Sequence, residues 1–105
     1  MVLENIKIID LKNTITNNKY CLILVGSKGC GKCASLIPVL EKVYQRYPSL
    51  TYVISPTEIV NKVLAPAKYH AMTTIFFKDG VQHSLLKYSY LPQAYERRIN
   101  IMLRD

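Results

Sequence analysis

Two cysteines separated by two residues, Cys30 and Cys33, are the side chains of this sequence best suited to chemistry. They follow an apolar run at residues 20–25 and precede a segment with helical periodicity. A thiol at the start of a helix lies beside unpaired backbone N–H groups, which together with the helix dipole stabilise a thiolate. The thiolate is both the nucleophile of disulfide exchange and a ligand for soft metals. The spacing therefore predicts a redox or metal-binding pair.

Glycines and lysines surround the two thiols, within a glycine-rich turn at residues 26–31. Lys28 and Lys32 add positive potential on both sides of Cys30, and a positive potential favours the thiolate over the thiol. Gly31 lies between the cysteines in the same turn. We expect Gly31, Lys28 and Lys32 to support the reactivity of the pair.

Length and composition indicate one small domain spanning residues 1–105, with half of the residues hydrophobic. No apolar run approaches the ~20 residues of a membrane span, so no membrane partner is expected. The first ten residues lack the basic region and apolar core of a secretory signal. We therefore expect a cytoplasmic protein, and in a reducing compartment a CxxC pair is more often catalytic or metal-binding than a permanent bridge.

A formal net charge of +7 marks the chain as a basic protein. The basic side chains are spread along the sequence, and only Arg97 and Arg98 are adjacent. No basic and aromatic residues interleave in a way that would favour base stacking, so a nucleic-acid partner is not expected. A solvated positive surface is the main interpretation, with an acidic protein partner as the alternative. We expect a monomer.

Hydrophobic periodicity predicts alternating strands and helices. Strands are expected at residues 6–9, 20–25, 50–54, 73–78 and 81–87, and Asp79-Gly80 predicts a hairpin between the last two. Helices are expected at residues 10–16, 32–47, 55–65 and 92–103. We expect Pro38 to interrupt the second helix, Ser55 to cap the third, and Leu103 to lie on the apolar face of the last. The resulting order, βαβαβαββα, is an α/β layout.

This order, with the CxxC motif after the second strand, resembles thioredoxin over essentially the whole chain. The resemblance is carried by the motif at residues 30–33, by Pro38, by residues 68–70 and by the hairpin sequence at 75–80. It implies the thioredoxin fold, a central mixed β-sheet flanked by helices. It also implies a thiol–disulfide oxidoreductase without a cofactor, in which Cys30 attacks a protein or small-molecule disulfide and Cys33 resolves the mixed disulfide. The electron donor and the direction of transfer stay open.

The chain departs from the family pattern at several places. Met72, followed by Thr73, stands where the family has a cis-proline that faces the CxxC. A cis bond before a residue other than proline costs about 2.5–4 kcal/mol, so Met72 is either trans, which reshapes the substrate-docking loop, or cis and strained. Leu24 replaces a frequent buried aspartate, Gly29 a tryptophan and Lys32 a proline. These changes predict a divergent member with a narrow or unusual substrate.

Other functions compete for the same residues. Residues 26–33 nearly match a phosphate-binding loop, but Cys33 replaces the hydroxyl that binds Mg²⁺. The CxxC supplies two of the four ligands of a zinc site, so no metal is expected unless His70 or a second chain contributes. The rival class is therefore a thioredoxin-fold binding or scaffold domain whose CxxC is inert or holds metal. Cys21 is expected to be a buried core thiol and His83 a surface residue.

Overall fold

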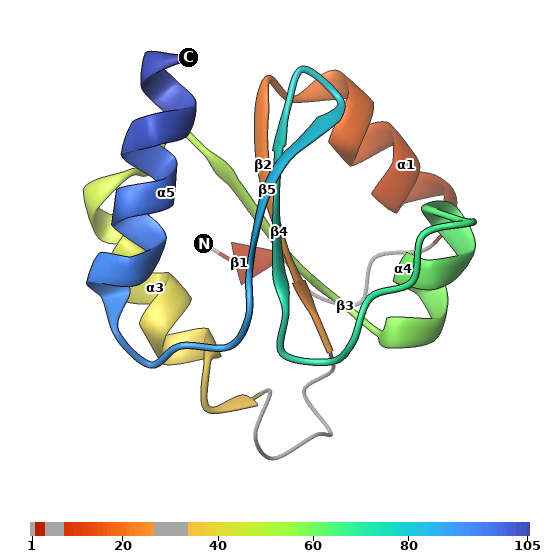
Figure 1. Cartoon of the computed structure of the whole chain (residues 1–105), viewed down its shortest axis with the longest axis horizontal. Coiled ribbons are helices and arrows are strands. Elements are labelled where there is room, and N and C mark those ends of the chain that lie inside the picture. The colour runs from red at the N-terminus through yellow and green to blue at the C-terminus, as the bar shows by residue number, and fades with distance from the viewer. Residues whose placement is uncertain (1, 4–7, 27–33) are drawn as a thin grey trace.

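The computed structural model describes residues 2–3, 8–26 and 34–105, and its elements follow the predicted order (Figure 1). The strands are β1 (Val2–Leu3), β2 (Tyr20–Val25), β3 (Thr51–Ser55), β4 (Thr74–Lys78) and β5 (Val81–Leu86). The helices are α1 (Ile8–Asn17), α3 (Ile37–Arg46), α4 (Thr57–Val63) and α5 (Pro92–Arg104). Within this described part, no helix is both long enough and apolar enough to cross a bilayer.

The described strands form one mixed sheet in the order β1-β3-β2-β4-β5. β2 pairs parallel with β3 and antiparallel with β4, while β5 pairs antiparallel with β4 and forms an edge. Figure 1 shows α1 and α4 on one face of the sheet and α3 and α5 on the other. The predicted α/β architecture with a central mixed sheet is confirmed.

Strand β2 is apolar throughout because both of its faces are covered. Successive side chains of a strand point to opposite faces, so Leu22 and Leu24 pack under α3 and α5 while Ile23 and Val25 pack under α1 and α4. Cys21 shares the second cluster and is fully buried, which confirms its prediction as a core thiol.

The amino-terminal elements differ from the prediction. Residues 8 and 9, expected in a strand at 6–9, belong to α1, and the short strand lies earlier, at Val2–Leu3. Leu11 and Ile15 are buried in the cluster on the α4 side of the sheet. Because these side chains are one helical turn apart, burial on the sheet favours the helical period over the local alternation of apolar residues.

The start of α4 also differs from the prediction. Ser55 is the last residue of β3, and its carbonyl accepts a hydrogen bond from the Gly26 N–H at 2.8 Å. Pro56 takes the N-cap position, without a side-chain cap. The predicted capping by Ser55 is therefore wrong, because pairing with β2 draws Ser55 into the sheet.

The predicted interruption of the helix at residues 32–47 falls just before Pro38. Ala34 is helical, Ser35 and Leu36 form a turn, and α3 begins at Ile37 with Pro38 in its first turn. Proline lacks an N–H and clashes with the carbonyl four residues earlier, which explains a break at this point. At the other end of the chain, Leu103 lies on the exposed side of α5, so its predicted place on the apolar face is wrong.

The predicted hairpin at Asp79-Gly80 is confirmed. Asp79 has φ 53° and Gly80 has φ 80°, the left-handed pair that a tight turn between antiparallel strands requires. The Asp79 N–H donates to the Lys19 carbonyl at 2.7 Å, which ties the turn to the chain just before β2. Farther along, the pairing of β4 and β5 shifts register between Phe76 and Phe77, and this irregularity leaves His83 as the extra residue of β5.

Substituting alanine for Gly80 tests the cost of this turn. A Cβ there would meet nothing nearer than the Thr16 Cα at 4.0 Å, so the penalty comes from the positive φ alone. We expect Gly80→Ala to lower the free energy of unfolding in urea by about 1–2 kcal/mol. Asp79→Asn is the matched control and should change little, because asparagine also tolerates this conformation. Equal stability of the Gly80→Ala and wild-type proteins would contradict the assigned turn.

The buried thiol predicts a specific dependence of stability on pH. Burial raises the pKa of Cys21 from 9.0 to about 12. Between these values the unfolded chain releases the proton and the folded chain keeps it, so this contribution to stability is complete below pH 9 and is lost as pH rises toward 12.

We expect the unfolding free energy of the wild type to fall by as much as about 1.4 kcal/mol per pH unit more than that of Cys21→Ala in this window. Denaturant titrations of both proteins at matched pH values measure the difference. Parallel pH curves would contradict the burial of this thiol.

Candidate functional site

The described part of the candidate site lies where the carboxyl end of β2 meets the loop before β4. The Val25 N–H donates to the Thr73 carbonyl at 2.8 Å, and the Met72 N–H donates to the Val25 carbonyl at 2.6 Å. Val25 is five residues before Cys30 in the chain. Met72 and Thr73 are thus bonded directly to the strand end from which the chain continues toward the CxxC motif.

Five of the predicted site residues, Cys30, Cys33, Gly31, Lys32 and Lys28, lie outside the described residues. Their roles stay predictions. The structure describes the chain on either side of them, up to Gly26 and again from Ala34. Of the predicted supporting residues, Met72 and Thr73 are the two that the structure describes.

Met72 adopts the trans alternative. Among the described residues the cis peptide bond is Ala65–Pro66, and Met72 instead has a left-handed φ of 69°. For a residue with a side chain, this conformation costs about 1–2 kcal/mol. It aims the Met72 N–H at Val25, a bond that proline could not make. The loop therefore replaces a proline constraint with a backbone hydrogen bond and a strained torsion.

Below this end of the sheet the environment is apolar. Leu24 is fully buried among Leu36, Ile54 and Tyr95, and lies beside Thr74 in the pairing of β2 with β4. Burial also raises the pKa of the Tyr95 phenol, which stays protonated and donates to the Ser89 carbonyl at 3.0 Å. The position that would supply a buried carboxylate in the family pattern supplies a hydrocarbon side chain here.

The loop that carries Met72 is also anchored at its other end. The Tyr69 N–H donates to Asn61 Oδ1 at 2.6 Å, and Asn61 Nδ2 donates to the Tyr69 carbonyl at 3.1 Å. The Tyr69 hydroxyl donates to Gln82 of β5. Asn61 lies on α4, so the segment from Tyr69 to Thr73 is held between α4, β2 and β5.

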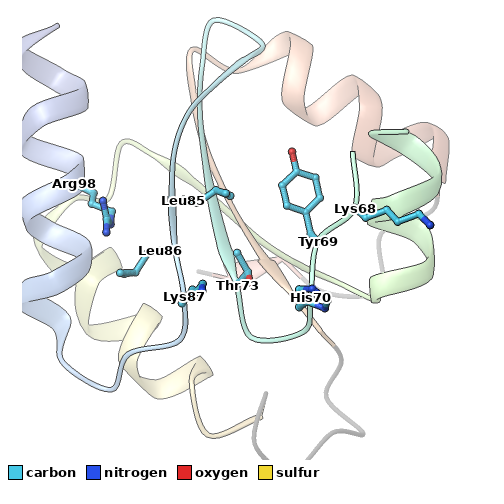
Figure 2. A pocket seen from close by; sticks show the side chains of 8 residues that line it. All are labelled: Lys68, Tyr69, His70, Thr73, Leu85, Leu86, Lys87 and Arg98. Atoms are coloured by element: carbon cyan, nitrogen blue, oxygen red, sulfur yellow. The ribbon is translucent and has the colours of Figure 1, made fainter. Parts of the chain in front are cut away.

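A pocket of about 490 Å³, not foreseen from the sequence, adjoins this loop (Figure 2). Its lining combines basic, apolar and hydroxyl side chains: Lys68, Tyr69, His70, Thr73, Leu85, Leu86, Lys87 and Arg98. These residues come from the loop, from the end of β5 and from α5. Because they are distant in sequence, their only sequence signal is the general excess of positive charge.

The two histidines have different settings. His70, which the sequence offered as a possible metal ligand, is exposed in the loop before β4 and lines the pocket. His83, predicted at the surface, is half-buried, with Nε2 2.9 Å from Asp105 Oδ2. Within residues 2–3, 8–26 and 34–105, no three His, Cys, Asp or Glu side chains gather in a way that could hold a metal ion.

Proline at position 72 tests the loop geometry directly. A trans-proline has φ near −65° and no N–H, so it would lose the hydrogen bond to Val25 and could not adopt the observed torsion. We expect Met72→Pro to lower the unfolding free energy by about 3 kcal/mol. Met72→Gly keeps the N–H and tolerates positive φ, so it should stay within about 1 kcal/mol of the wild type. A Met72→Pro protein as stable as the wild type would contradict this geometry.

Comparison with known proteins finds close matches in structure only. No protein-family model and no curated protein matches the sequence. The oxidised thioredoxin of Plasmodium falciparum has a TM-score of 0.78 at 18% identity, over 96% of this chain and 97% of that one.

Two further solved structures agree. The Trypanosoma brucei brucei thioredoxin has a TM-score of 0.79 at 16% identity, over 100% of this chain and 93% of that one. The oxidised mitochondrial thioredoxin 3 of Saccharomyces cerevisiae has a TM-score of 0.75 at 24% identity, over 95% and 94%. With the strand order and helix layers described above, these likenesses confirm the predicted architecture: the chain has the thioredoxin fold.

Proposed function

We propose that this chain is a divergent thioredoxin-like thiol–disulfide oxidoreductase that exchanges disulfides through Cys30 and Cys33. The observation that carries the proposal is the pair of hydrogen bonds between Val25 and the loop at Met72 and Thr73. They bring that loop to the end of β2, five residues before Cys30. In the thioredoxin fold, this junction is where a CxxC motif and a substrate-docking loop meet.

The proposed reaction transfers two electrons from the dithiol to a substrate disulfide. The Cys30 thiolate attacks one substrate sulfur, which forms a mixed disulfide and releases the other substrate sulfur as a thiolate that takes a proton. The Cys33 thiolate then attacks Cys30, which frees the second substrate thiol and leaves Cys30 and Cys33 joined. The reverse sequence oxidises a dithiol substrate.

Two departures from the family pattern, Lys32 and Leu24, are expected to change the reduction potential of the pair and the rate of resolution. Lys32 favours the thiolate of reduced Cys30, and stabilising the reduced form makes the couple more oxidising. Leu24, buried among apolar side chains, leaves Cys33 without the carboxylate that would accept its proton. We therefore expect resolution of the mixed disulfide to be slow compared with attack.

The docking loop supports a restricted choice of substrate. Its Met72 N–H is already bonded to Val25 and so is not available to a substrate backbone. The Met72 side chain packs partly against the core, at the position that the sequence pattern assigns to the proline of the family. We propose a protein disulfide substrate for a cytoplasmic, monomeric chain, with an inert or metal-holding scaffold as the competing function.

A redox titration tests the proposed function. We expect a reversible two-electron step that is lost in Cys30→Ser and kept in Cys21→Ala, because Cys21 is buried away from solvent. A midpoint near about −270 mV indicates a reductant, and one near about −120 mV an oxidant. The absence of a step, or stoichiometric zinc in the purified wild type, would support the scaffold function instead.

Trapping with Cys33→Ser tests the division of labour between the thiols. Without the resolving thiol, mixed disulfides on Cys30 should accumulate and be released by a reductant. Cys30→Ser is the matched control and should trap little. Equal trapping by the two variants would contradict the assignment of Cys30 as the attacking thiol.

A further inference from the structure

The pocket beside the Met72 loop lies across the free edge of the sheet. Leu85 is opposite Ile75 and Leu86 is opposite Thr74 in the pairing of β5 with β4. As neighbours in one strand, Leu85 and Leu86 point to opposite faces, yet both line the same pocket. With β4 on the other side of β5, the pocket must extend over the unpaired edge and carboxyl end of β5 (Figure 2).

The charges lining this pocket are of one sign. Lys68, Lys87 and Arg98 contribute positive charge to it, and no described lining residue is acidic. The nearby carboxylates of α5 and the carboxyl terminus are engaged elsewhere: Glu96 pairs with Arg46 at 2.9 Å, and the Asp105 carboxylate contacts His83.

Arg98, which lines this pocket, has one guanidinium nitrogen without a hydrogen-bond partner in the described part of the chain. Its Nε is buried and has no hydrogen-bond partner among the described residues. Lys68 and Lys87, both exposed, have no described ion pair either. A partner that carries several carboxylates would bring negative charge and hydrogen-bond acceptors to this basic lining.

The shape and backbone of the pocket select an extended peptide among anionic partners. An unpaired strand edge presents N–H and C=O groups that an added strand satisfies, and the two leucines offer apolar contact on both faces. A second copy of this chain is a less suitable partner for this edge, because its charge has the same sign. With a net charge of +7 on each chain, that pairing is repelled.

We propose that an extended acidic segment of a protein substrate docks as an added strand along β5, with its carboxylates toward Lys68, Lys87 and Arg98. This inference rests on the proposed function, because Thr73 belongs both to the pocket and to the loop bonded to Val25. A segment held along β5 would lead its disulfide toward the end of β2. The proposed substrates are therefore proteins whose reactive disulfide lies next to an acidic, extended segment of the chain.

The binding test uses the full-length reduced protein and a short fluorescent peptide of alternating glutamate and valine without cysteine. The matched peptide carries glutamine in place of glutamate. We expect the glutamate peptide to bind at least about tenfold more tightly, with affinity falling as salt is added. Equal affinity for the two peptides would overturn the proposal.

Charge variants locate the site. Lys68→Gln with Lys87→Gln should weaken binding of the glutamate peptide about fivefold. Lys12→Gln with Lys42→Gln removes the same charge from exposed positions of α1 and α3 outside the pocket, and should change affinity less than twofold. Equal losses in the two pairs would overturn the proposal.

Two further measurements separate this inference from its alternatives. Peptide binding should slow hydrogen exchange of β5 backbone amides about tenfold, and unchanged β5 amides would overturn the added-strand geometry. A single-stranded oligonucleotide that binds more tightly than the peptide, through the same lysines, would overturn the choice of a peptide. Because the probe lacks cysteine, selective binding without a redox step refutes the enzyme alone, and a redox step without selective binding refutes the docking surface alone.

Discussion

The backbone pairing at the end of β2 is the constraint on which the rest of this site depends. β2 is the central strand, buried on both faces and paired on both sides, so the position and direction of its last residue are fixed by the whole sheet. Val25 in turn fixes the position of the Met72 loop through one hydrogen bond that it donates and one that it accepts. The loop in turn is tied to α4 through Asn61. Two layers of the fold therefore converge on the segment that precedes the CxxC motif.

The conformation of the loop before β4 can be fixed either by a proline or by a backbone hydrogen bond, and the two differ in their energetic consequences. Proline restricts the chain before folding and leaves no N–H to satisfy. Here the chain accepts a left-handed torsion at Met72, offset by a short bond to Val25. Leu24 is buried in the apolar core below this end of the sheet, and the pocket beside the loop is lined by basic side chains. Under the proposed function, discrimination between substrates would depend on the surrounding charge rather than on the loop backbone.

Much of this fold was predictable because its signals are local. The apolar run of β2, the turn at Asp79 and the helix-breaking Pro38 each act through neighbouring residues, and each appears where expected. Ser55 does not cap α4 as expected, because its partner in the sheet, Val25, is distant in sequence and draws it into β3. The pocket was missed for the same reason, since Lys68, Lys87 and Arg98 meet only through tertiary structure. The chemistry of the thiols rests on the motif, and the trans state of Met72 required the structure.

The irregular pairing of β4 and β5 has a consequence for solubility. An exposed strand edge invites uncontrolled stacking between molecules, and a bulge protects against it by twisting the strand away from a flat template. The extra residue, His83, lies near the middle of β5 and is tethered to the carboxyl-terminal Asp105. The regular stretch of β5 that follows, residues 84–86, is short, and a short strand edge is a poor template for repeated strand addition. The irregular pairing of β4 and β5 would thus protect the free protein against amyloid-like growth and still leave the edge of β5 free to pair with one added strand.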